Sequence, residues 1–61
     1  MKYRSMTKTQ LAMAAGVHRN TLGNWLIPHR KILAKMGVSP HTRVFPPAAV
    51  KYICETFDID V

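Results

Sequence analysis

Residues 8–27 have the sequence KTQLAMAAGVHRNTLGNWLI, and this stretch decides how the chain folds. Thr7 and Gln10 have the spacing of a capping box, in which each side chain accepts a hydrogen bond from the other residue's backbone N–H. A helix is therefore expected to begin after Thr7. Gly16 is expected to end this helix, because glycine readily adopts the left-handed conformation found at helix C-termini.

A second helix is expected over residues 19–27, after a connection of only two residues. Leu22, Trp25 and Leu26 repeat at the i, i+3, i+4 spacing of one apolar helix face, so all three are expected to be buried. For Trp25, this spacing favours burial over the alternative, in which an exposed tryptophan stacks on the bases of a single-stranded nucleic acid.

Two further helices are expected beyond Pro28. This proline cannot continue the second helix without loss of a hydrogen bond, but it suits the first turn of a third helix over residues 28–36. Gly37 followed by Val38 is typical of a Schellman ending to that helix. Three of its side chains are expected to face inward, Ile32, Leu33 and Met36, and three outward, Arg30, Lys31 and Lys35.

The last helix is expected over residues 48–57, after Pro46 and Pro47. Cys54 falls on the inner side of this helix, which indicates that it is a buried small hydrophobe. The apolar residues that define this side repeat at i, i+3, i+4, i+7 and are Val50, Ile53, Cys54 and Phe57.

Residues 39–45 are expected to form a loop that ends in a short extended piece, Val44 and Phe45. This piece is compatible with a rudimentary wing before the last helix, in which residues 1–5 would be the partner strand. The sequence therefore predicts an all-α fold: a compact four-helix domain, in one unit over residues 1–61.

The charge of the chain is strongly basic and unevenly distributed. Nine Lys and Arg residues oppose three acidic ones, which gives a formal net charge of +6. The acids, Glu55, Asp58 and Asp60, all lie in the last seven residues, so residues 1–54 carry no acidic side chain. Such a field suits a polyanion such as nucleic acid, or an anionic membrane surface.

Residues 8–27 resemble the helix-turn-helix motif of bacterial and phage DNA-binding proteins. Ala12 is small where the second helix must cross the first closely, and Gly16 follows four residues later at the turn. The apolar positions that join the two helices are filled by Leu11, Ala15, Val17, Leu22 and Trp25. The order of elements beyond this motif looks like that of small winged-helix proteins of the MerR and excisionase type. The resemblance implies sequence-specific binding of double-stranded DNA, by a small transcriptional regulator or an excisionase-like architectural factor.

If the second helix is the recognition helix, Asn20 and Asn24 lie nearly opposite its buried side, at about 100° per residue. Asparagine can form a bidentate pair with adenine, and arginine with guanine. The candidates for contact with base edges are Arg19, Asn20, Gly23 and Asn24. A glycine inside a helix costs about 1 kcal/mol relative to alanine, and the gain expected from Gly23 is closer approach of the backbone to the groove.

Phosphate contacts are expected at the periphery of this helix pair. The first turn of the first helix offers free N–H groups and a favourable dipole. The candidates for phosphate binding are Lys8, Thr9, His18, Thr21, Arg30, Lys31 and Arg43, with Gln10, Lys35 and His41 beside them.

Other classes of function fit the residues less well. An enzyme is not expected, since the three carboxylates are near one end and no nucleophile and base have a meaningful spacing. His18, His29, His41 and Cys54 are separated by 11, 12 and 13 residues, which matches no compact metal site. We expect no cofactor and no small-molecule ligand. A protein–protein interaction module with an acidic partner, and an RNA-binding adaptor, remain the alternatives.

The expected location and partners follow from these features. A single cysteine indicates a reducing compartment, and no stretch approaches the roughly 20 apolar residues of a transmembrane helix. We therefore expect a cytoplasmic, nucleoid-associated protein with no membrane partner. One recognition helix has a small footprint, so a homodimer or a co-bound regulatory protein is expected in addition to double-stranded DNA.

Overall fold

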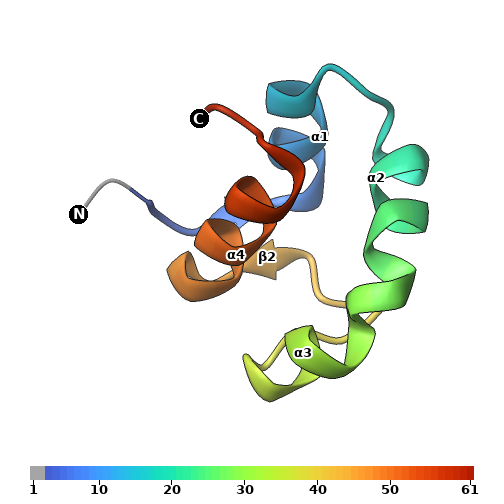
Figure 1. Cartoon of the computed structure of the whole chain (residues 1–61), viewed down its shortest axis with the longest axis vertical. Coiled ribbons are helices and arrows are strands. Elements are labelled where there is room, and N and C mark those ends of the chain that lie inside the picture. Colours follow the sequence, from blue (N-terminus) through green and yellow to red (C-terminus); the bar gives the residue numbers. More distant parts are fainter. Residues whose placement is uncertain (1–2) are drawn as a thin grey trace.

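Helices make up most of the chain in the computed structural model, which describes residues 3–61 (Figure 1). The elements in chain order are strand β1 (Met6–Thr7), helices α1 (Lys8–Ala15) and α2 (Arg19–Leu26), the 3-10 turn η1 (Ile27–His29), helix α3 (Arg30–Lys35), strand β2 (Val44–Phe45) and helix α4 (Pro47–Phe57). The predicted bounds of α1, α2 and α4 are confirmed to within a residue or so.

The predicted arrangement of four separate helices is wrong. α2, η1 and α3 follow one another directly, as a single bent arm that runs down one side of Figure 1. Pro28 lies in the 3-10 turn, and the α-helical part of the predicted third helix begins only at Arg30. Proline lacks a backbone N–H group and therefore suits this tighter turn, which changes the direction of the chain without a loop. Residues 3–61 therefore form three helical arms.

The all-α description also needs correction, because the described chain contains a small antiparallel sheet. β1 pairs with β2, with Met6 opposite Phe45 and Thr7 opposite Val44. The extended piece at β2 is therefore confirmed. Its partner lies just after the suggested residues 1–5, of which 1 and 2 are outside the described residues.

The helix ends are set by local signals, as the sequence predicts. Thr7 and Gln10 form the capping box of α1, with both N···O distances near 3 Å: 2.9 Å from the Thr7 N–H and 3.1 Å from the Gln10 N–H. Gly16 then ends α1 in the left-handed conformation at φ 75°. At the end of α3, Gly37 has φ 82° and the Val38 N–H donates to the Leu33 carbonyl at 2.9 Å. This is the Schellman pattern.

The buried hydrophobic side chains of the described residues form one cluster, to which all three arms contribute. Its members are Leu11, Ala12, Leu22, Leu26, Leu33, Val38, Phe45, Ala49, Val50, Ile53, Cys54 and Ile59. Cys54 is thus buried, as expected. Trp25, Met36 and Phe57 are only half-buried at the margin of the cluster.

The predicted inward orientation of Ile32 is wrong, because 44% of its surface is exposed. The six-residue α3 packs against the core along one narrow side, where Leu33 is buried. Its neighbour Ile32 is turned away from that side by about 100°.

Replacement of Leu22 by alanine tests whether α2 packs into the core through this side chain. Leu22 is fully buried, so Leu22→Ala should lower the free energy of unfolding by roughly 2 to 5 kcal/mol. This approaches the roughly 3 to 5 kcal/mol that so small a core supplies. Thr21→Ala, at the exposed neighbouring position, should change the free energy of unfolding by less than about 0.5 kcal/mol. Urea unfolding of both variants, monitored by circular dichroism, measures these changes. Equal midpoints for the two variants would contradict this placement of α2.

Candidate nucleic-acid interface

The outward side of α2 carries an uncharged polar pair. Asn20 and Asn24 are both exposed and lie one helical turn apart. Leu22 and Leu26 on the inner side are 0% and 7% exposed, so the orientation of the helix is fixed by the core. Ile27, at 49% exposure, extends the outward row by a further turn. The two asparagine amides therefore project into solvent with their donors and acceptors available.

The N-terminus of α2 is capped by a histidine. His18 is the N-cap residue, and its Nδ1 accepts the backbone N–H of Asn20 at 3.1 Å. Because Nδ1 accepts this hydrogen bond, Nε2 is the ring nitrogen that can donate one. Arg19 and Thr21 are exposed at the same end of the helix. Four predicted contact residues thus lie at the start of α2: His18, Arg19, Asn20 and Thr21.

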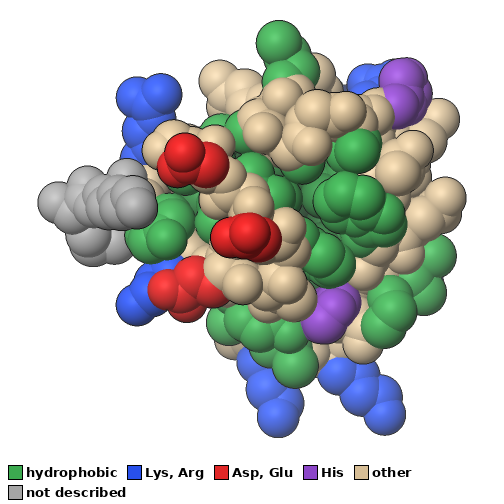
Figure 2. Space-filling model, turned by 45° about the horizontal axis from the view of Figure 1, so that its top comes forward, with side chains coloured by type: hydrophobic (Ala, Val, Ile, Leu, Met, Phe, Trp, Pro, Cys, Tyr) green, Lys and Arg blue, Asp and Glu red, His purple; other side chains and the backbone are tan. Residues whose placement is uncertain are grey.

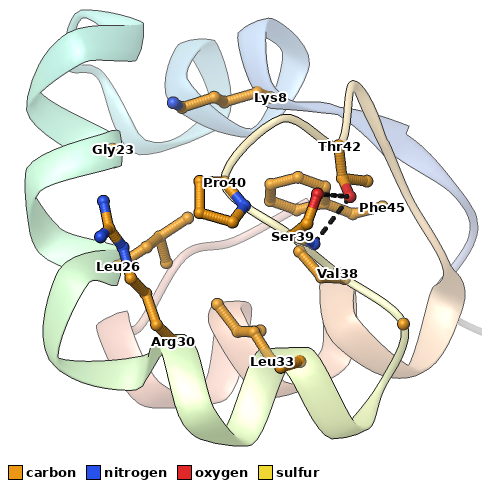
Figure 3. A pocket seen from close by; sticks show the side chains of 12 residues that line it. Lys8, Gly23, Leu26, Arg30, Leu33, Val38, Ser39, Pro40, Thr42 and Phe45 are labelled. Carbon is orange, nitrogen blue, oxygen red and sulfur yellow. Dashed lines mark hydrogen bonds between the residues drawn. The ribbon is translucent and has the colours of Figure 1, made fainter.

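Lys8 lies against the middle of α2, beside Gly23. A Cβ atom built on Gly23 would lie 2.8 Å from Lys8 Nζ and 3.2 Å from Lys8 Cε. Gly23 is half-buried, and Figure 3 shows the Lys8 side chain extending from α1 towards it. The structure therefore gives a reason for this glycine that the sequence did not reveal: it leaves room for the end of a lysine side chain.

Three further predicted phosphate-binding residues lie near Lys8. The Lys8 N–H donates to the Arg43 carbonyl at 3.2 Å, which continues the small sheet and brings Arg43 to the start of α1. Thr9 is exposed in the first turn of the same helix. Arg30, at the start of α3, lines the same cavity as Lys8 and Gly23. Lys8 and Arg30 thus line one cavity, and the backbone of Arg43 lies beside Lys8.

The remaining basic residues of α3 lie outside that cavity. Lys31 and Lys35 are exposed, as predicted, but do not line it. Lys31 follows Arg30 directly and lies about 100° further round the helix. The predicted contact residues of α3 therefore divide between the cavity and the open surface.

The loop before β2 is held by its own hydrogen bonds. The Ser39 N–H donates to Thr42 Oγ1 at 2.8 Å, and the Thr42 N–H returns a hydrogen bond to the Ser39 carbonyl at 3.1 Å. The His41 N–H donates to Ser39 Oγ at 3.2 Å. His41 and Arg43 are exposed on this loop. The loop therefore presents them from a defined turn.

A cluster of aromatic rings joins η1 and the end of α2 to α4. His29 Nδ1 lies 2.8 Å from the Tyr52 hydroxyl, and the rings of Trp25 and Phe57 stack with centroids 5.4 Å apart. Sequence periodicity gave no sign of the His29–Tyr52 pair, since 23 residues separate its members. The cluster explains why Trp25 is held in place although it is only half-buried.

The acidic residues lie apart from the outward side of α2. Glu55, Asp58 and Asp60 are exposed at the C-terminal end of α4 and just beyond it. Figure 2 shows the acidic side chains gathered on one part of the surface. His18, His29, His41 and Cys54 occupy a helix cap, the aromatic cluster, a loop and the core, respectively. Their positions in the structure do not form a common site.

Comparison of the chain with protein-family models, curated protein sequences and solved structures finds no match. Within residues 3–61, every helix is too short or too polar to cross a membrane.

Replacement by alanine should have opposite effects on the free energy of unfolding at Gly23 and at Gly16. At Gly23, the added methyl group meets only the flexible end of Lys8, so Gly23→Ala should raise the free energy of unfolding by up to about 1 kcal/mol through helix propensity. At Gly16, the left-handed backbone at φ 75° should make alanine cost about 1 kcal/mol or more. Urea unfolding of both variants measures the difference. Destabilisation by Gly23→Ala would contradict the expectation that the flexible end of Lys8 moves aside at little cost.

Proposed function

We propose that this chain binds double-stranded DNA in a sequence-specific manner, with α1 and α2 as a helix-turn-helix and α2 as the recognition helix. The observation that carries the proposal is the exposed pair Asn20 and Asn24 on the outward side of a helix whose inner side is buried. Two uncharged amides supply hydrogen-bonding groups for base edges, and the surrounding cations supply attraction to phosphates.

In this proposal the outward side of α2 lies in the major groove. Asn20 and Asn24 read adenine, and Arg19 reads guanine, by bidentate hydrogen bonds. Gly23 contributes by allowing Lys8 to lie beside α2, which places an ammonium group next to the reading helix. The phosphate-binding residues remain those expected from sequence: Lys8, Thr9, His18, Thr21, Arg30, Lys31 and Arg43.

The sheet formed by β1 and β2, with the loop before it, acts in this proposal as a rudimentary wing. The hydrogen bonds of Ser39 and Thr42 support this role, because they fix the direction in which His41 and Arg43 are presented. The end of α4, with its three acidic side chains, would face away from DNA because carboxylates and phosphates repel one another. A small regulator or an excisionase-like factor that acts as a homodimer or with a co-bound protein fits so small a surface.

The first test of the proposal is the salt dependence of duplex binding. Each phosphate that is neutralised releases counterions, so the logarithm of the affinity should fall with the logarithm of the salt concentration by about 0.9 per contact. Fluorescence anisotropy with a labelled duplex measures this slope. Duplex RNA and poly-glutamate serve as comparisons, and tighter binding to either would favour the corresponding alternative over DNA. An affinity that does not change between about 50 and 200 mM salt would contradict the electrostatic contacts.

The second test separates base reading from general attraction. Asn20→Ala and Asn24→Ala should each weaken binding to a duplex selected from random sequences by about 1 to 3 kcal/mol, with almost no effect on a scrambled duplex. Lys8→Gln and Arg43→Gln should weaken binding to both duplexes alike and reduce the salt slope by about one unit each. Lys51→Gln, which removes an exposed cation of α4, is the control for these two variants and should leave both affinities and the salt slope almost unchanged. If the asparagine variants affect both duplexes equally, α2 is not the recognition helix.

A further inference from the structure

A cavity of about 350 Å³ lies between the start of α1, the bent arm of α2 and α3, and the loop before β2 (Figure 3). This volume falls within the range of small-molecule binding sites, roughly 300 to 1,000 Å³. The sequence gave no sign of it, because its walls come from segments far apart in the chain. The periodicity of each helix identifies only the side that faces the core.

The floor and the rim of the cavity differ in chemistry. The floor is made by four buried apolar side chains, Leu26, Leu33, Val38 and Phe45. Lys8 and Arg30 belong to the lining as well, and Figure 3 shows them approaching from different elements. No acidic residue of the described chain is among the lining residues, so neither cation is neutralised from within the cavity.

The hydroxyl groups at the rim are already engaged. Thr42 Oγ1 accepts the Ser39 N–H at 2.8 Å and lies 3.2 Å from Ser39 Oγ. These bonds stabilise the loop that forms one wall. The groups that remain to recognise a ligand are therefore the two cations and the apolar floor.

We propose that this cavity binds a small organic carboxylate with an apolar body. The carboxylate would pair with Arg30, whose planar guanidinium matches it in a bidentate geometry, and with Lys8 as a second cation. The apolar body would cover the floor and remove it from water, which is the favourable term that a simple anion lacks.

This inference goes beyond the proposed function, because DNA would not use the whole site. A backbone phosphate bound by Lys8 and Arg30 has no apolar part to place on the floor formed by Leu26 and Phe45. If both ligands use the same two cations, the carboxylate and DNA should compete. Binding of the carboxylate is nevertheless measured without DNA, so its failure and the failure of DNA binding are separate results.

The test is an NMR titration of the isotopically labelled full chain with octanoate, which joins a carboxylate to an apolar chain. Saturable changes are expected in the amide signals of Gly23, Leu33 and residues 37–39, 41 and 42. 1-Octanol keeps the apolar chain and lacks the charge, and should bind at least about tenfold more weakly. Acetate and inorganic phosphate keep the charge and lack the chain, and should also bind at least about tenfold more weakly.

Variants test the two cations directly. Arg30→Gln and Lys8→Gln should each weaken octanoate binding several-fold, while Lys51→Gln on α4 should leave it unchanged. The spread of amide signals in the same spectra shows that each variant is folded. The proposal is overturned if octanol binds as tightly as octanoate, if phosphate or acetate does so, if Lys51→Gln weakens binding as much as Arg30→Gln, or if octanoate produces no saturable change at the cavity.

Discussion

The packing of α2 against α1 is the constraint on which the rest of the structure depends. Leu11, Ala12 and Leu22 are at most 1% exposed, so the two helices meet through side chains that are almost completely removed from water. Gly16 makes this contact attainable within a three-residue turn, because its left-handed backbone reverses the chain without strain. Once Leu22 is fixed in the core, helical geometry directs Asn20 and Asn24 outward. The proposed reading surface is thus a consequence of core packing.

The cations around that surface are assembled by two smaller features. The pairing of β1 with β2 brings Arg43 to the start of α1, through a hydrogen bond to the Lys8 N–H. The missing side chain at Gly23 lets Lys8 lie beside α2, where it also meets the cavity that Arg30 lines. One lysine therefore links the proposed DNA surface to the proposed carboxylate site. This link would allow a small ligand to affect DNA binding through shared charges, without a change in fold.

The features that the sequence predicts are those set by residues close together in the chain. The ends of α1 and α3 follow from Thr7, Gly16 and Gly37, whose signals act within a few residues, and the inner side of α4 follows from its repeat of apolar residues. The sheet, the joined arm of α2 and α3, and the cavity could not be predicted in the same way. Each depends on segments that meet only after folding. Trp25 shows this clearly: its spacing predicts full burial, but the side chain is only partly buried and stacks on Phe57.

The most direct test of the proposed DNA binding is to map which residues, if any, respond to a DNA duplex. Amide NMR spectra of the labelled protein, recorded with and without a selected duplex, report the contact residue by residue. If α2 is the recognition helix, the largest signal changes fall on residues 8–10 and 18–24 and on residues 39 and 41–43 of the loop, with little change along the middle of α4. Largest changes around Tyr52 and Phe57, with α2 unaffected, would contradict it.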